Sequence, residues 1–165
     1  MIITKEKLIE LNACKDGYKY WLECNEPDIV KFMRRCIKDE KYNWAMWLFS
    51  RVVEQRTRTR SCIYSASLVL HIFEEKYPND NGPRDAIKAA RRWVNNPSDK
   101  NRRSSVAAYA ATYLPGYAPG PGYAADTAAD TAAGATTADK KERYIKIINH
   151  AIRLVKNGVK NEHNK

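Results

Sequence analysis

A proline-punctuated corner between two helical segments constrains the fold of this chain more than any other stretch. The first segment ends where Tyr77 meets Pro78, because the residue before a proline is pushed out of the right-handed helical region. Turn-forming residues follow, and Pro83 then suits the first turn of a second helix, where its missing N–H is no loss. Residues 62–94 therefore predict a helical hairpin. Apolar residues recur at helical spacing on both sides of the corner, namely Ile63, Ala66, Leu70 and Phe73, then Ala86, Ile87, Ala90 and Trp93.

The same helical periodicity runs through most of the chain. Thr4 is placed to cap a first helix, Pro27 to start a third, and Ser98 to cap the helix after the hairpin. Because 165 residues can bury a sizeable core, we expect one domain spanning residues 1–165. The predicted fold class is all-α, a single-domain bundle of about seven or eight helices. Further helical patterns cover about residues 15–24, 27–38, 42–53, 98–113 and 140–158.

Low-complexity sequence separates the hairpin region from the last helix. Residues 114–123, LPGYAPGPGY, hold three of the seven prolines and three of the seven glycines, which predicts an irregular loop. Residues 124–138 form an alanine-rich segment in which a helix is plausible, because alanine has the highest helix propensity. Gly158 is placed to end the last helix, and we expect residues 159–165 to form a frayed tail.

Positive charge falls in three blocks along the chain. The formal net charge is +10, yet residues 1–50 are close to neutral, with nine basic and eight acidic side chains. Residues 51–60 carry four arginines and one glutamate, and residues 84–103 carry seven basic and two acidic residues. Residues 140–165 carry eight basic and two acidic residues. A helical fold can gather such blocks on one face, which would favour an anionic partner.

Arginine is densest in residues 55–61, QRTRTRS, which we expect to form the turn before the hairpin. Arginine is costly to bury and binds phosphate or carboxylate groups bidentately. A solvated turn is the simpler interpretation, and a surface for an anionic partner is the alternative. The candidate residues for binding a partner or nucleic acid are Arg56, Arg58, Arg60, Arg84, Arg91, Arg92, Arg102, Arg103, Lys140 and Lys141.

The densest aromatic cluster lies in the segment YNWAMWLFSRV. Trp44, Trp47, Leu48 and Phe49 follow one another at helical spacing. Aromatic side chains of this size usually lie in a core, where each removes on the order of 150–250 Å² from water. We therefore expect core packing, and a ligand-stacking role for Trp44 and Trp47 is the less favoured alternative.

Several classes of protein are disfavoured by the sequence. No apolar run reaches the roughly 18–20 residues of a membrane span, and the first residues lack the pattern of a signal peptide. The four cysteines form no CxxC pair and lie far in sequence from the histidines, which predicts free, mostly buried thiols in a reducing cytosol. No motif for nucleophilic, nucleotide-dependent or metal-dependent catalysis occurs. We expect a cytoplasmic, non-enzymatic protein without metal, cofactor or membrane association.

The run LVLHIFEEKYPNDNGPRDAIKAARRWV resembles the alanine-rich, all-helical immunity-protein family. The opening ITKEKLIELNACKDGYKYWLE, the segment YNWAMWLFSRV and the alanine-rich stretch before a basic last helix are similar to that family too. The chain departs from the family pattern at residues 114–123, where the proline-rich loop interrupts the alanine-rich helix. The resemblance implies a helical protein that neutralises a toxin or accompanies phage or mobile-element functions, and it supplies no residue roles.

Two functions from different classes fit these observations. The first is an immunity-like or inhibitor-like module that blocks an acidic protein partner, or a ribonucleoprotein complex, through a basic helical surface. The second is a basic protein that grips nucleic-acid phosphates, and one variant of it is a phage or mobile-element inhibitor of a nucleic-acid-guided defence complex. Basic blocks clustered on one concave face would favour the second, and dispersed basic residues around an exposed apolar patch would favour the first.

Overall fold

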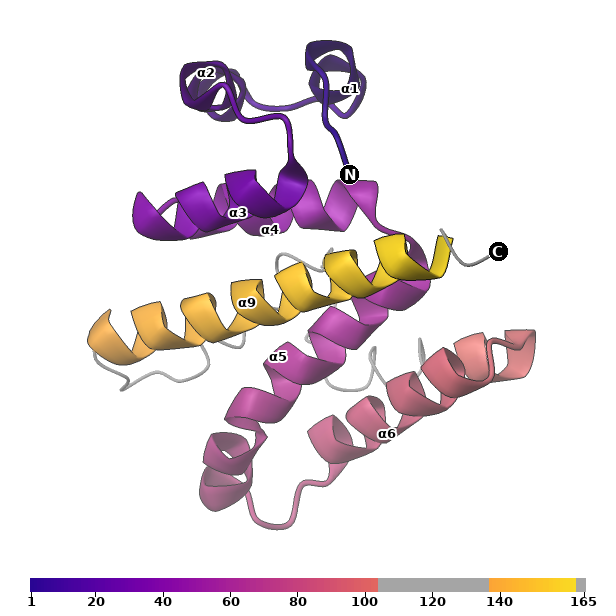
Figure 1. Ribbon diagram of the computed structural model, residues 1–165. Helices are drawn as coiled ribbons and strands as arrows, with labels where there is room; N and C mark the ends of the chain where they lie inside the picture. Colours follow the sequence, from indigo (N-terminus) through magenta and orange to yellow (C-terminus); the bar gives the residue numbers. More distant parts are fainter. Residues whose placement is uncertain (104–136, 163–165) are drawn as a thin grey trace. The chain divides into compact units, whose positions relative to one another are not determined.

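In the computed structural model, residues 1–103 and 137–162 are described, and all of their named elements are helices (Figure 1). The only β-type pairing among these residues is an isolated bridge between Ile2 and Asp28. The all-α prediction is confirmed. Contacts along the chain divide it into two compact units, which are treated separately below. The first unit comprises Met1–Val53 with Ile148–Lys165, and the second comprises Glu54–Ile147.

Four short helices and the last part of a long one make up the first unit. They are α1 (Lys5–Glu10), α2 (Lys15–Cys24), α3 (Ile29–Lys38), α4 (Tyr42–Val52) and the part of α9 (Thr137–Glu162) from Ile148 onward. Thr4 caps α1 as predicted, because its hydroxyl accepts a hydrogen bond from the Lys7 N–H at 3.3 Å. The ends of α1, α2 and α3 are followed by residues with positive φ, namely Asn12, Asn25 and Glu40, which turn the chain sharply.

The core of the first unit is apolar and closely packed. On α3, Ile29, Met33 and Cys36 are 0% exposed, and Phe49 on α4 is also 0% exposed. The predicted core position of Phe49 is therefore confirmed. On α1 and α2, the apolar side chains are only partly covered: Ile9 and Leu22 are 65% and 38% exposed, whereas the neighbouring Leu8 and Trp21 are buried. Helices of six and ten residues each bury only part of their apolar surface.

A helical hairpin forms the main described part of the second unit. It consists of α5 (Gln55–Lys76) and α6 (Gly82–Asn95), which lie side by side and are joined by a short bend (Figure 1). The corner is where the sequence predicts it: α5 ends before Tyr77, and Pro83 stands in the first turn of α6. Beyond the hairpin, the Ser98 hydroxyl accepts a hydrogen bond from the Asn101 N–H at 3.3 Å and caps helical residues 99–103.

Two predicted boundaries are wrong. Residues 55–61 are not a turn but the first turns of α5, since glutamine and arginine are good helix formers. Gly158 does not end the last helix, which continues to Glu162, so residues 159–162 are helical rather than frayed. One glycine lowers helix propensity without forcing a stop. The predicted loop at 114–123 and most of the alanine-rich segment 124–138 lie outside the described residues.

Candidate interaction surface

Three arginines fix how α5 and α6 pair. The Arg84 Nε donates to Glu74 Oε1 at 2.6 Å near the corner, and Arg91 Nη2 donates to Ser67 Oγ at 3.3 Å further along. At the open end, Arg56 Nε donates to the carbonyl oxygen of Val94 at 2.6 Å. These contacts join α5 and α6 in antiparallel order from the corner to the open end, so arginine side chains set the register of the hairpin.

Arg56 closes the end of α6. Val94 lies in the last turn of α6, where backbone carbonyls have no partner within the helix and the helix dipole is negative. A half-buried guanidinium that donates to such a carbonyl satisfies it and places positive charge where the helix favours it. Arg56 was predicted only as a binding residue. Its observed contact is structural.

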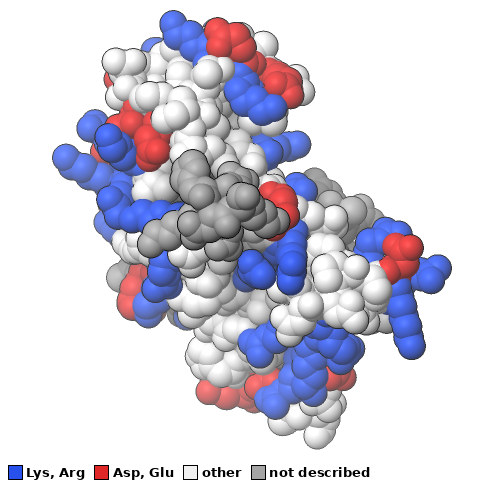
Figure 2. All heavy atoms as spheres, turned by 45° about the vertical axis from the view of Figure 1, so that its right-hand side comes forward, with Lys and Arg blue, Asp and Glu red and all other residues white. Residues whose placement is uncertain are grey.

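The outer face of α6 is basic. Arg84, Lys88, Arg91 and Arg92 are all exposed, and at 100° per residue they fall within about 100° of the helix circumference. On the other side of the helix, Ile87, Ala89, Trp93 and Val94 are buried. In Figure 2, Lys and Arg side chains form separate groups among uncharged and acidic side chains in the lower part of the view. The helix is thus amphipathic: its apolar face is buried, and its basic face is exposed.

Part of this basic charge is neutralised within the unit. Besides Arg84 with Glu74, Lys88 Nζ lies 3.2 Å from Asp85 Oδ1, and Arg102 Nε lies 3.5 Å from Asp99 Oδ1. The hydrogen bond from the Arg84 guanidinium holds the pKa of the Glu74 carboxyl below its ordinary value of 4.5. The surface therefore has both signs of charge, with positive charge in excess.

An exposed aromatic side chain stands at the corner of the hairpin. Tyr77 is 47% exposed, its ring centroid lies 5.0 Å from that of Phe73, and the Lys76 ammonium lies 5.4 Å from its centre. These neighbours restrict the ring while leaving much of it open to solvent. Sequence reasoning used Tyr77 only as the helix end. The sequence nevertheless contains a signal for this position. Tyr77 is an aromatic residue between the charged Lys76 and Pro78, at the corner that the proline fixes.

All ten predicted site residues fall in the second unit, where they are divided among α5, α6, helical residues 99–103 and α9. On α5, Arg56 and Arg60 share a side of the helix, whereas Arg58 points about 200° away from Arg56. Arg60, Arg92 and Arg103 are exposed and have no hydrogen bond or ion pair to another residue of the described ranges. Lys140 and Lys141 lie near the start of α9. The basic face of α6 is the part that the structure assembles from these predictions.

The thiols differ from the prediction of mostly buried cysteines. Cys36 is buried, but Cys14 is exposed and Cys24 and Cys62 are intermediate; all four are free. Burial raises the pKa of the Cys36 thiol to about 12, so Cys36 stays protonated at neutral pH. Within residues 1–103 and 137–162, no group of three or more His, Cys, Asp or Glu side chains is arranged to hold a metal ion. No helix of this part of the chain has the length and apolar character needed to cross a bilayer.

Comparisons with known proteins do not assign a family or a function to this chain. The chain matches no protein-family model, no curated protein and no solved structure.

Proposed function

We propose that this chain is a non-enzymatic protein-binding module, immunity-like or inhibitor-like, that blocks an acidic protein partner through the α5–α6 hairpin. The contact surface, called the hairpin surface below, consists of Tyr77 with Arg84, Lys88, Arg91 and Arg92. The observation that carries the proposal is the exposed Tyr77 ring, supported by Phe73 and Lys76, at the corner that leads into α6, whose exposed face is rich in arginine.

Tyrosine and arginine are the residue types that contribute most often to binding hot spots. A tyrosine restrained by Phe73 and Lys76 loses little conformational freedom on binding, because its ring is already held in place. The hairpin register is likewise fixed before any partner arrives, by the contacts of Arg56, Arg84 and Arg91. Such preorganisation favours a surface that binds a folded partner without rearranging.

The charge pattern supports an acidic protein rather than a phosphate backbone. Glu74, Asp85 and Asp99 are paired with basic side chains, so acidic groups stand within the positive region. Acidic groups in a nucleic-acid groove would repel phosphates, whereas a protein interface accommodates both signs and uses complementary charge to steer association. The excess positive charge of α6 then selects an acidic partner surface.

The test is affinity capture from the native host cells with the full chain and two hairpin-surface variants, Tyr77→Ala and Arg92→Glu. We expect a partner that is enriched by the wild type and lost or strongly reduced with both variants. The matched control is Arg34→Glu, the same charge reversal at an exposed position of α3 in the first unit, which should retain the partner. For the purified partner, Tyr77→Ala should weaken binding by about tenfold or more.

Nucleic acid is the alternative outcome of the same experiment. Capture is repeated after nuclease treatment, and binding to short duplex and single-stranded DNA and RNA is measured by fluorescence anisotropy across a salt series. A steep fall of affinity with salt, with Arg92→Glu weaker and Tyr77→Ala unchanged, would replace the protein-binding proposal by phosphate binding. A partner retained equally by both hairpin-surface variants would also overturn the proposal.

A further inference from the structure

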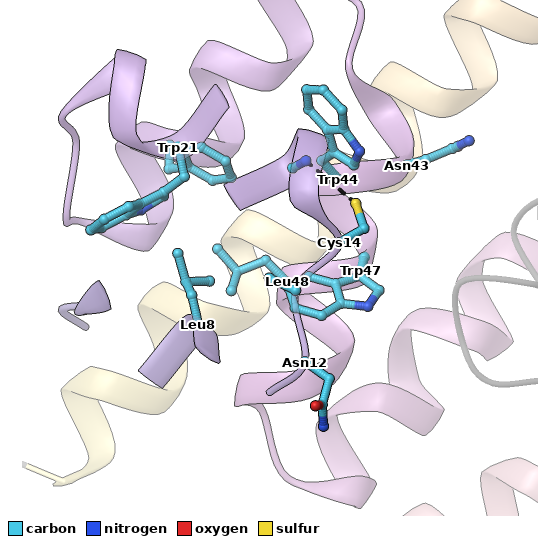
Figure 3. A pocket seen from close by; sticks show the side chains of 11 residues that line it. Leu8, Asn12, Cys14, Trp21, Asn43, Trp44, Trp47 and Leu48 are labelled. Carbon is cyan, nitrogen blue, oxygen red and sulfur yellow. Dashed lines mark hydrogen bonds between the residues drawn. The ribbon is translucent and has the colours of Figure 1, made fainter. Parts of the chain in front are cut away.

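The first unit contains an apolar cavity of about 230 Å³. Its walls come from α1 to α4 and the α1–α2 connection, and its largest side chains are Trp21, Trp44 and Trp47 (Figure 3). Leu8, Phe32 and Leu48 also line it. Three of the four tryptophans of the chain therefore border one space. Trp93, the fourth, belongs to the second unit.

Trp44 and Trp47 differ from the core residues beside them. Leu48 and Phe49 are 1% and 0% exposed, whereas both indoles are only half-buried. These two tryptophans are therefore less completely packed than we expected of core residues. The cavity that they line is a place where a ligand could stack on them.

Side chains that do not line the cavity contact two of its tryptophans. The Trp44 ring lies 4.9 Å from the Tyr20 ring and 5.2 Å from the Lys41 ammonium, and the Arg51 guanidinium lies 5.9 Å from the Trp47 ring. Gly17 stands against Trp44, where an added Cβ would lie 3.6 Å from the indole and 3.1 Å from Cys14 Sγ. A side chain at Gly17 would therefore press on Cys14 Sγ, whereas it would meet the indole at an ordinary contact distance. The space is preformed, with its aromatic walls restrained.

The chemistry of the walls selects a neutral occupant. None of the residues that line the cavity carries a charge. Apart from the N–H groups of the three indoles, the polar groups among them are the side chains of Asn12, Cys14 and Asn43, and these three residues are exposed, so they mark the solvent side. A charged ligand would lose its hydration without gaining an ionic partner. Three indoles instead offer stacked and edge-to-face contacts to a flat aromatic ring.

We propose that this cavity binds a neutral, flat aromatic molecule of one or two fused rings. An engineered apolar cavity of about 150 Å³ accommodates benzene, so about 230 Å³ leaves room for a second fused ring. A ligand of that size reaches a dissociation constant below about 1 mM when most of its surface is buried. The site is separate from the hairpin surface in residue content and in compact unit, so the binding of small aromatics and the capture of a protein partner succeed or fail independently.

The test uses the full ¹⁵N-labelled chain and indole as the probe. The four tryptophan side-chain N–H signals are followed by NMR during titration. We expect saturable shifts of the Trp21, Trp44 and Trp47 signals and no saturable shift of the Trp93 signal, which serves as an internal control. Indole-3-acetate, which adds a negative charge, should bind at least tenfold more weakly. Absence of saturation up to about 10 mM indole, or equal shifts of all four signals, would overturn the proposal.

A cavity-filling variant separates binding inside the cavity from binding to its outer rim. Ala13→Leu adds apolar volume at the cavity wall and should keep the thermal midpoint while weakening indole binding at least tenfold. Cys14→Leu adds volume at an exposed wall position, with loss of the 3.3 Å hydrogen bond that Cys14 Sγ accepts from the Gly17 N–H, and decides the question if Ala13→Leu does not fold. Ala90→Leu on α6, a matched enlargement in the second unit, should leave indole binding unchanged. A folded Ala13→Leu or Cys14→Leu protein that binds indole like the wild type contradicts the proposed location.

Discussion

The α3–α4 core and the α5–α6 hairpin are both built from helices, yet different interactions hold them together. Between α3 and α4, the most buried residues are large and apolar, including Ile29, Met33 and Phe49 at 0% exposure. On α5, the buried residues are Ser61 and Ser65, each 1% exposed, and the apolar stripe predicted there is only half-buried.

Directed polar contacts accompany this modest apolar burial of α5. Arginines from both helices reach across to fix the register, and the Ser65 hydroxyl donates to the Ser61 carbonyl within α5 at 3.0 Å. Hydrogen bonds specify geometry more strictly than apolar contacts but contribute less net free energy each. The α3–α4 region is therefore held together by apolar burial, whereas polar contacts hold the exposed, charged surface of the hairpin in a defined shape.

The largest expected effect tests the apolar core. Phe49→Ala should lower the free energy of unfolding by about 3–5 kcal/mol, because it removes a fully buried ring and leaves a cavity. Trp47→Ala should cost less, although its side chain is larger, because Trp47 is half-buried and borders a space that is already open. Urea unfolding monitored by far-UV circular dichroism measures both values. Equal losses would mean that Trp47 packs as tightly as Phe49 in solution.

A smaller effect tests the polar hairpin. Arg56→Met should lower the free energy of unfolding by about 1–2 kcal/mol, because it leaves the Val94 carbonyl at the end of α6 without its charged donor. Arg60→Met is the matched control on the same side of α5, with an exposed side chain, and should change stability by less than about 0.5 kcal/mol. Urea unfolding gives the magnitudes. Amide hydrogen exchange should locate the Arg56→Met effect in the last turn of α6, and similar losses in the two variants would contradict this role.

The smallest effect concerns acid stability of the hairpin corner. Arg84 lowers the pKa of Glu74 in the folded state, so the contribution of this pair is present above about pH 4.5, the ordinary value of the carboxyl. It is lost as the pH falls through the lower, folded-state pKa. Glu74→Gln should therefore be less stable than the wild type near neutral pH and approach it at about pH 3. The adjacent exposed Glu75→Gln is the control, and thermal midpoints across pH provide the measurement. A stability difference that stays constant down to about pH 3 would exclude this linkage.

Local sequence signals located most helices correctly. The predicted range 15–24 coincides with α2, Thr4 and Ser98 cap the helices that they were predicted to cap, and the corner lies at Tyr77–Pro78. These features depend on the conformational preferences of one residue and its near neighbours. Sequence therefore indicated them before any tertiary contact was known.

Other features of the structure depended on contacts between parts of the chain that are distant in sequence. The arginine-rich residues 55–61 contain both helix-forming and polar residues, and they became the start of α5 rather than a turn. The Nε of Arg56 reaches a carbonyl 38 positions away, and three tryptophans from two different helices border one cavity. No short-range sequence pattern predicts such long-range contacts.

The sequence by itself determined the all-helical class, the proline corner and the excess of positive charge, because each follows from residue type and short-range spacing. Only the tertiary structure decided which arginines hold the hairpin together, which remain exposed, and that Trp44 and Trp47 border a cavity instead of filling a core. The physical reason is that burial and pairing depend on the partner surface, which helix packing brings together from distant parts of the chain.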